Sequence, residues 1–397
     1  AVPMRVLARS FMDKFTDIAQ KNPKWHKNNW YPTIQTGEQS DDAFFTNRLV
    51  IATVDQVLAS FLNIPYGIPK RLDNINAGAF IGSYLIFDEF HLYPTQEMLL
   101  TVLAMLKMLK GLSRFVLMSA TFSPALLTAI ASQLGAKSIY DAPDTPLSEG
   151  IFSDIVTLRK QKRRWQVRDG NLDSLAIEQA LQEHRTVLVI CNQVERAQAV
   201  YREFKATHAD TDCVLLHSRF YPEDRRHIEN IILQSLGKDA DDGRKKVIIA
   251  TQVVEVGLDI SADILLTECA PAASLIQRAG RCARWGGAGD VWVYQPAIHP
   301  DTGLPNYAPY FQDGLETVCQ LTWDTLSSHG FDGEILPYNK EQQLVKAAHE
   351  TYDQERLIDG LHSKLENRIN RITGCMTERD EGYVSELIRN QDNSSAR

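Results

Sequence analysis

The stretch YLIFDEFHLY, residues 84–93, places two adjacent carboxylates directly after a run of aromatic and aliphatic residues. Such a run is typical of a strand in a parallel sheet, which helices cover on both faces. Asp88 and Glu89 would then begin the loop at the carboxyl end of that strand, where open α/β sheets bind ligands. Two interpretations stay open on this stretch alone. The pair either begins a polar loop, or forms a divalent-metal site in which Asp88 holds Mg²⁺ and Glu89 orients or deprotonates a water.

Strand-like runs alternate with amphipathic helical stretches along most of the chain. One series spans residues 47–135, and a second spans residues 185–294. Repeated strand–helix units predict parallel sheets with right-handed crossovers, so we expect an α/β fold. The two successive series predict two α/β domains in tandem.

The domain limits follow from changes in composition. A Pro- and Asp-rich stretch and then a basic run interrupt the alternation, so we expect a linker within residues 140–170. The first domain is then expected at residues 1–150 and the second at residues 151–298. From about residue 300 the pattern becomes helical and irregular, which predicts a mainly helical C-terminal accessory segment at residues 299–397.

The composition is that of an ordinary globular protein. The chain has 397 residues, 44% of them hydrophobic and 23% charged, which is enough for two or three domains with their own cores. No apolar run reaches the ~18 residues of a membrane span. The N-terminus AVPMRVLARS lacks a signal-peptide pattern, and the six cysteines include no C-x-x-C pair. We expect a cytoplasmic protein with reduced thiols and no membrane partner.

The charge is unevenly distributed. A net charge of −8 argues against a protein that binds nucleic acid over its whole surface. Residues 158–168, LRKQKRRWQVR, nevertheless hold six basic residues and no acidic one. Such a run is either a solvated face or linker, or a contact with a polyanion, and both interpretations stay open.

The strongest chemical signal is a row of arginines. Arg278, Arg281 and Arg284 recur every three residues in SLIQRAGRCARW, residues 274–285. On a helix, side chains at every third position drift only slowly around the axis, so at least two guanidiniums could converge on one site. Arginine suits planar phosphate contacts, and residues 271–289 contain no acid that could pair with it. We therefore predict that these arginines await an anionic ligand rather than an internal carboxylate.

Several motifs, taken together, resemble those of superfamily-two helicases in order and approximate spacing. They are Asp88-Glu89-Phe90-His91, Ser119-Ala120-Thr121, LLHSRFYPEDR, ATQVVEVGLDI and QRAGRCAR. Within that superfamily, the last three look most like the CRISPR-associated helicase of type I interference systems. That family is recruited by a crRNA-guided surveillance complex to unwind and destroy target DNA. The resemblance covers residues 3–294 and implies two tandem RecA-like domains that use ATP and Mg²⁺.

The resemblance also implies roles for individual residues. Asp88 would hold Mg²⁺, Glu89 would activate water, and Arg281 and Arg284 would contact the γ-phosphate across the interdomain cleft. Other residues expected to bind the nucleotide, or to couple its hydrolysis to domain motion, are Ser119, Thr121, Gly257, Asp259, Gln277 and Arg278. The expected path of single-stranded DNA, contacted mainly through its phosphates, comprises Arg5, Thr53, His217, Ser218, Arg219, Thr251 and Gln252.

The sequence departs from the family pattern in two ways. It contains no G-x-x-x-x-G-K-[ST] phosphate loop, since its only Gly-Lys pair, Gly237-Lys238, lacks the leading glycine. It also contains no His-Asp dipeptide, the mark of the family's metal-dependent nuclease domain. We expect a piece of a motor whose phosphate loop lies upstream, with little ATPase of its own and a separate nuclease domain or subunit. Two alternatives stay open: another superfamily-two RNA or DNA motor, or a non-catalytic nucleic-acid-binding scaffold.

Overall fold

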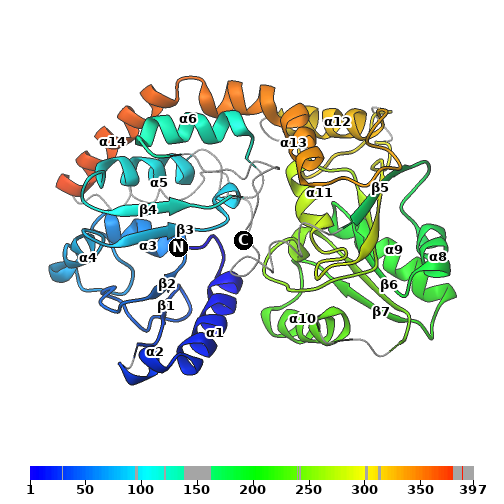
Figure 1. Cartoon of the computed structure of the whole chain (residues 1–397), viewed down its shortest axis with the longest axis horizontal. Helices are drawn as coiled ribbons and strands as arrows, with labels where there is room; N and C mark the ends of the chain where they lie inside the picture. Colours follow the sequence, from blue (N-terminus) through cyan, green and yellow to red (C-terminus); the bar gives the residue numbers. More distant parts are fainter. Residues whose placement is uncertain are drawn as a thin grey trace. The chain divides into compact units, whose positions relative to one another are not determined.

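The computed structural model describes residues 1–28, 30–93, 97–119, 122–137, 162–238, 240, 243–299, 303–311, 314–378 and 387. These residues form two compact units (Figure 1). Unit 1 takes its residues from 1–138 and 354–397, and unit 2 takes its residues from 139–353. Both units combine parallel strands with helices, which confirms the predicted α/β class.

Unit 1 contains two parallel ladders joined by the first residues of the chain. Strand β1 (Thr33–Gln35) pairs with β2 (Val50–Ala52), and β3 (Tyr84–Phe87) pairs with β4 (Arg114–Leu117). The Val2 amide donates to the carbonyl of Ala52 (2.9 Å), and the Asp88 amide donates to the carbonyl of Ala1 (3.0 Å). Residues 1 and 2 therefore bond to the end of β2 on one side and of β3 on the other.

The helices of unit 1 pack on these strands around one apolar core. Helix α5 is apolar on nearly all sides, and its buried residues meet those of α3, α6 and α14 in that core. Ser123 caps α6 by accepting from the Leu126 amide (3.3 Å), and Gly135 ends it in the left-handed conformation. The helical elements are α1 (Arg5–Lys21), α2 (Pro23–Lys27), α3 (Val54–Phe61), η1 (Lys70–Leu72), α4 (Ile75–Ala79), η2 (Phe90–Leu92), α5 (Glu97–Met108), α6 (Pro124–Leu134), η5 (Gln354–Ile358) and α14 (Leu361–Glu378).

Unit 2 is built on a six-stranded parallel sheet in the order β5-β10-β9-β6-β8-β7. Its strands are β5 (Lys162–Arg168), β6 (Thr186–Ile190), β7 (Asp212–Leu216), β8 (Lys246–Ala250), β9 (Ile264–Glu268) and β10 (Ala288–Tyr294). Every residue of β8 and β9 is buried. This is the physical reason for their apolar runs, residues 247–250 and 264–266, because helices cover both faces of a parallel sheet.

Two apolar cores lie on the two faces of this sheet. Along β6, Val187 and Val189 belong to one core with Phe204 of α9, whereas Leu188 belongs to the other with Leu275 of α11. The helical elements of the unit are α8 (Ser174–Glu183), α9 (Val194–Thr207), α10 (Pro222–Leu236), η3 (Gln252–Val254), α11 (Ala272–Ala279), α12 (Leu315–Leu326) and α13 (Tyr338–Asp353).

Residues 162–168, at the end of the range in which a linker was expected, form the edge strand β5. Trp165 of β5 is buried at 1% exposure in the core of unit 2. Arg164 donates to Asp290 (2.8 Å), Arg163 lies 3.6 Å from Glu341, and Arg168 stacks on Trp292. Because these cations have partners inside the unit, a contact with a polyanion is not favoured here. The remainder of the basic run lies outside the described residues.

The C-terminal accessory segment is mainly helical, as predicted, and its helices are divided between the units. Helices α12 and α13 pack in unit 2, whereas α14 packs on α5 in unit 1, where Arg368 bonds to Thr101 (3.4 Å). The domain limits proposed from composition remain predictions. Within the described ranges, no helix combines the length and apolar character needed to cross a bilayer.

Candidate functional site

The acidic pair lies at the carboxyl end of β3. The Asp88 Oδ1 accepts from the backbone N–H of Glu89 (2.9 Å), and Glu89 adopts the left-handed conformation at φ 48°. A bulky residue enters this region only where its surroundings enforce it. Here the next residue, Phe90, is 1% exposed, and its amide donates to the Met118 carbonyl beyond β4 (2.9 Å). The turn therefore leaves both carboxylates partly exposed at the sheet edge.

His91 and Ser119 meet beside this pair. β3 and β4 run parallel in register, so the residues that follow them share one edge of the ladder. The Ser119 Oγ lies 3.3 Å from the His91 Nδ1, and Glu89 Oε2 lies 3.6 Å from the same nitrogen. Burial lowers the pKa of His91 to about 4, so the ring is neutral at pH 7. Thr121 lies outside the described residues.

Two unit 1 residues expected on the DNA path have distinct surroundings. Arg5 is 53% exposed in its side chain and pairs with Glu38 (2.8 Å). Thr53 follows β2 and is only 3% exposed, and its Oγ1 has no hydrogen-bond partner within the described structure. Single-stranded DNA could contact Thr53 directly only if the residues around Thr53 moved. The Arg5 side chain is already accessible.

The corresponding residues of unit 2 follow β7. His217 is 4% exposed, its Nδ1 accepts from the Arg219 amide (3.3 Å), and its ring stacks on Phe220. Burial and then the charge of Arg219 lower the pKa of His217. Ser218 and Arg219 are exposed, and the Arg219 guanidinium contacts Glu195 (2.5 Å). The buried histidine thus supports the backbone that presents the two exposed side chains.

The loop after β8 lies at the same edge of the sheet. Thr251 is buried, and its amide donates to the carbonyl of Leu216 at the end of β7 (3.2 Å). The Gln252 side chain donates to the carbonyl of Asn192, which follows β6 (2.8 Å). Gly257 has φ 87°, a backbone conformation that side chains disfavour, and it allows the chain to turn there.

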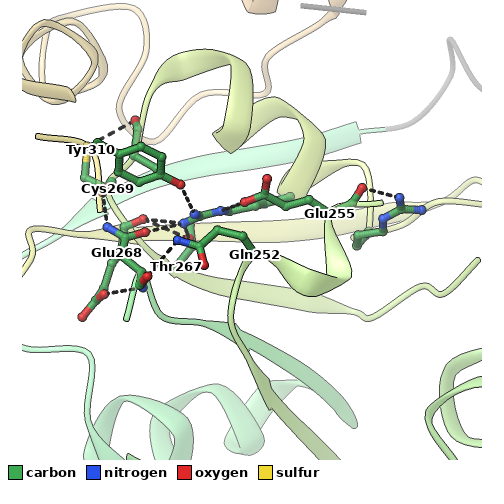
Figure 2. Close-up of polar contacts among 10 residues, drawn as sticks. Gln252, Glu255, Thr267, Glu268, Cys269 and Tyr310 are labelled. Atoms are coloured by element: carbon green, nitrogen blue, oxygen red, sulfur yellow. Dashed lines mark hydrogen bonds and ion pairs between the residues drawn. The ribbon is translucent and has the colours of Figure 1, made fainter. Parts of the chain in front are cut away.

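The arginine row lies directly beside this loop, and Arg278 is at its centre. Arg278 is fully buried. Figure 2 shows acidic and polar residues from several segments converging there. The Arg278 guanidinium donates to Glu255 Oε1 (2.7 Å), Asn192 Oδ1 (3.0 Å), Thr267 Oγ1 (2.9 Å), the Glu268 carbonyl (3.1 Å) and the Tyr310 hydroxyl (2.9 Å).

This network keeps both members of the buried ion pair charged. Burial lowers the pKa of Arg278, but Tyr310, Glu255 and Glu268 together outweigh that effect and raise it. Burial raises the pKa of Glu255, and Arg278 opposes the rise. At 2.7 Å from a guanidinium that stays protonated, we take the Glu255 carboxylate to be ionised at neutral pH.

The prediction that the arginines lack an internal carboxylate was wrong. Arg278 pairs with Glu255, and Arg284 pairs with Asp259 (2.6 Å). The Arg281 side chain is also engaged, because it donates to the Glu255 carbonyl (2.5 Å). Both acids belong to the motif ATQVVEVGLDI, residues 250–260, rather than to residues 271–289. Helix α11 ends at Ala279, so Arg281 and Arg284 lie beyond it.

The three arginines therefore differ in what they can do. Arg278 is enclosed and holds the motifs together, whereas the Arg284 side chain is 36% exposed and its carboxylate partner 50% exposed. Arg281 is 9% exposed. Gln277 lies in the last turn of α11, one residue before Arg278. Direct contact with a phosphate is thus most accessible to Arg284, and the nucleotide roles of all four residues remain predictions.

Sequence reasoning missed the residues that complete the network. Asn192 follows the apolar run of β6, Glu268 ends β9, and Tyr310 belongs to the accessory segment. The Asn192 amide also donates to Glu268 Oε2 (2.7 Å), and Arg196 donates to Glu268 Oε1 (3.1 Å). A polar residue at the end of a buried apolar run was the available signal for the first two. No motif pointed to Tyr310.

The described residues suit a magnesium ion only if it retains other ligands. No group of three His, Cys, Asp or Glu side chains within the described ranges could enclose a metal. A partly exposed carboxylate such as Asp88 fits Mg²⁺, which keeps several waters and is usually held by one or two carboxylates and substrate phosphates.

The fold and these motifs are those of the RecA-like domains of superfamily-two helicases. A family model described as DEAD/DEAH box helicase matches residues 1–130. A second model, described as CRISPR-associated nuclease/helicase Cas3, C-terminal, matches residues 183–286. The chain thus contains a region that matches the DEAD/DEAH box helicase family and a region that matches the Cas3 family, which confirms the resemblance drawn from its motifs.

The proteins that this chain resembles are much longer than the chain itself. The chain is 28% identical over 277 residues to the CRISPR-associated endonuclease/helicase Cas3 of Escherichia coli, a match that covers 64% of this chain and 30% of that protein. The structure of T. fusca Cas3 with AMPPNP matches with a TM-score of 0.65 and 20% identity, covering 95% of this chain and 49% of that one. A chain of a pre-nicking CRISPR RNA-guided surveillance complex matches with a TM-score of 0.57 and 21% identity, over 98% of this chain and 52% of its own length. This chain spans about a third of the curated relatives that it matches first.

Loss of the Glu255 carboxylate should destabilise unit 2 strongly. Glu255→Ala leaves the Arg278 charge buried without its acid, which typically costs about 3–5 kcal/mol. Asp259→Ala is the matched control, because it removes the acid of the exposed Arg284 pair and should cost less than about 1 kcal/mol. Denaturant unfolding of both variants measures the difference. Equal losses would show that the buried pair has no special structural role.

Protonation of His349 should destabilise unit 2 in acid. His349 Nε2 accepts from the Ala273 amide in the first turn of α11 (3.3 Å), and burial lowers its pKa to about 4. Its unfolded pKa of about 6.5 is higher, so its contribution is complete above pH 6.5 and is lost as the pH falls towards 4. Relative to His349→Gln, which retains an acceptor, the wild type should lose about 3 kcal/mol of unfolding free energy over that window.

The comparison with His349→Gln also removes an opposing effect. Burial raises the pKa of Glu341 to about 7, so its contribution is present below about pH 4.5 and is lost as the pH rises towards 7. Both proteins contain Glu341, and the difference between them isolates the histidine. Parallel pH profiles of unfolding free energy would rule out the assigned shift.

Proposed function

We propose that this chain is the motor core of an ATP-dependent helicase that moves along single-stranded DNA during type I CRISPR interference, recruited by a crRNA-guided surveillance complex. One observation carries the proposal: in each unit, helicase-motif residues gather at the carboxyl edge of parallel strands. Asp88, Glu89 and Ser119 do so in unit 1, and Arg219 and Gln252 do so in unit 2. Two similar structures, T. fusca Cas3 with ATP and a CRISPR RNA-guided surveillance complex, support ATP as the ligand and such a complex as the partner.

In this proposal the two units contribute different groups to ATP hydrolysis. Asp88 would hold Mg²⁺, and the ion would supply positive charge to the phosphates. Glu89 would accept the proton of the water that attacks the γ-phosphorus as the bond to the ADP oxygen breaks. Arg281 and Arg284 would stabilise charge on the transferred group, Arg284 after release from Asp259. Cycles of ATP binding and hydrolysis would then move single-stranded DNA past Arg5, Thr53 and the residues after β7 and β8.

We further propose that the phosphate loop and the nuclease function are supplied from outside these 397 residues, because the sequence contains neither signature. The β3–β4 ladder supports the first part. Its outer face exposes Tyr84, Ile86 and Met118, which are 60%, 44% and 41% exposed. Parallel ladders are normally covered on both faces, so this bare apolar face suits a further helix and strand of the kind that carry a phosphate loop.

This 397-residue chain should bind single-stranded DNA but bind Mg-ATP only weakly. Charge-assisted bonds of the phosphate loop contribute about 1.5–3 kcal/mol each, so lacking several lowers ATP affinity by orders of magnitude. Fluorescence anisotropy with a labelled oligonucleotide should show binding that falls steeply with salt. Calorimetry should show no micromolar site for Mg-ATP.

Two exposed, ion-paired arginines provide the control for this experiment. Arg219 follows β7 at the carboxyl edge, whereas Arg244 precedes β8 at the opposite edge and pairs with Asp212 (3.0 Å). Arg219→Ala should weaken DNA binding severalfold, and Arg244→Ala should not. Tight ATP binding would show that another segment supplies the phosphate site. No DNA binding at all would reject the motor proposal.

Glu89→Gln should abolish turnover without abolishing nucleotide binding. In a polypeptide that joins these residues to a phosphate loop, loss of the positioned base should reduce the hydrolysis rate about 10²-fold or more. The control exchange Glu366→Gln removes the same charge from an exposed pair with Lys107 in the same unit and should leave the rate unchanged. A Glu89→Gln rate within threefold of the parent would remove Glu89 from the mechanism.

A further inference from the structure

A basic and aromatic surface lies on unit 1, away from every motif residue discussed above. We define the α2 platform as Lys24, Lys27 and Arg48 together with Trp25 and Trp30. The three cations are exposed, and both indoles are partly exposed. Within the described residues, none of the three cations has a carboxylate partner. In a chain of net charge −8, such a surface is a local exception.

The nearest carboxylates are already engaged elsewhere. Residues 18–37 contain no acid, and the residues that flank them are Asp17 and Glu38. Asp17 pairs with Lys21 (2.7 Å), and Glu38 pairs with Arg5 (2.8 Å) and Arg9. Asp42 is 8% exposed and accepts from the amides of residues 46 and 47 (2.9 and 2.8 Å). Asp41 is exposed and accepts from the Gln39 side chain (3.1 Å), so among the described residues no carboxylate forms an ion pair with the platform cations.

The platform is ordered although its helix has only five residues. A helix this short does not persist alone, because its first turn is costly to form. Here Asn22 accepts from the amides of Lys24 and Trp25 (3.0 and 3.3 Å), and Asn28 donates to the Lys24 carbonyl (2.6 Å). The Trp30 amide continues the turn by donating to the Trp25 carbonyl (2.9 Å). Capping at both ends keeps Lys24 and Lys27 in a defined arrangement.

Arg48 joins the platform through the β1–β2 ladder. Asn47 donates to the Tyr31 carbonyl (3.1 Å), and the Thr33 amide donates to the Leu49 carbonyl (3.0 Å). These bonds bring the segments that precede both strands together, and the Arg48 guanidinium lies 4.3 Å from the ring centre of Trp30. A stacked guanidinium keeps its donors available at the edge of the ring, where a phosphate can accept them.

The platform is separate from the expected DNA path. Figure 1 shows α2 at the end of α1, beside β1 and β2. Trp30 and Arg48 precede these strands, whereas Thr53 follows β2 at the carboxyl edge. Thr53 lies five positions after Arg48 along this extended segment, which corresponds to roughly 17 Å at about 3.3 Å per residue.

We propose that the α2 platform is a second contact site for single-stranded DNA, which binds its phosphates through Lys24, Lys27 and Arg48 and offers Trp30 to a base. The proposal rests on the proposed function and adds a site to it. Combining a cationic surface with partly exposed aromatic rings is the usual means of binding single strands without sequence preference. An acidic peptide would use the cations but would have no base to stack on the indole.

The test compares two triple variants of this 397-residue chain. Lys24→Ala/Lys27→Ala/Arg48→Ala removes the platform cations, and Arg202→Ala/Arg244→Ala/Lys346→Ala removes three exposed cations from unit 2. Both lose the same charge and should fold normally, which thermal unfolding checks. Anisotropy is measured with a labelled single strand, its duplex and polyglutamate over a range of salt concentrations. The platform variant should lower the slope of log affinity against log salt for the single strand by about 2, since each contact contributes about 0.7.

The outcomes separate this proposal from the proposed function. If the wild type binds single-stranded DNA and both triple variants lose affinity equally, the α2 platform is not a site and the motor proposal stands. An equal loss of polyglutamate binding in the platform variant would also overturn the proposal, because the surface would then be a site for any polyanion. Trp30→Ala should weaken binding of the single strand at least fivefold and change duplex binding less. No binding of single-stranded DNA by the wild type would overturn both proposals.

Discussion

The structure of unit 2 depends on the burial of one positive charge. Removing a guanidinium from water is costly unless its donors are satisfied and an acid neutralises it. For Arg278 the partners come from the ends of β6 and β9, from the loop after β8 and from Tyr310 of the accessory segment. Each of these segments must keep its place for the charge to remain buried. The network thereby links helix α11 and the loop of Glu255 to the sheet as one arrangement.

Parallel pairing provides the other constraint, because it brings sequence-distant residues to one edge. Side chains that follow parallel strands in register emerge together, as His91 and Ser119 do after β3 and β4. In unit 2 the same geometry brings Asn192 within reach of Gln252. Arg281 and Arg284 lie beyond the end of α11, and their partners belong to the loop after β8. The candidate catalytic groups are thus positioned by backbone pairing and by one buried ion pair rather than by contacts with each other.

Apolar patterns within short stretches of sequence predicted the strands. They did not predict contacts between residues that are far apart in the sequence. The apolar runs at β6, β8 and β9 are recognisable because both faces of each strand are buried. The strand β5 was not predicted, since its arginines hid the alternation of Trp165 and Val167 towards the core. Acid partners of the arginine row were sought only within the same segment. The position of Asp88 and Glu89 directly after a strand was predictable, because a short apolar run that ends in acids is typical of a strand followed by a loop.

The sequence by itself determined the α/β class, the order of the helicase motifs and the edge at which Asp88, Glu89 and Ser119 lie. These features depend on residues that are close in the chain, where hydrophobic periodicity is informative. Tertiary structure alone decided that Arg278 is structural, that Tyr310 contacts it and that Arg48 stacks on Trp30. The partners in the first two contacts are 23 and 32 residues from Arg278. No local pattern reports such pairings, because they arise from desolvation and from which surfaces the folded sheet brings together.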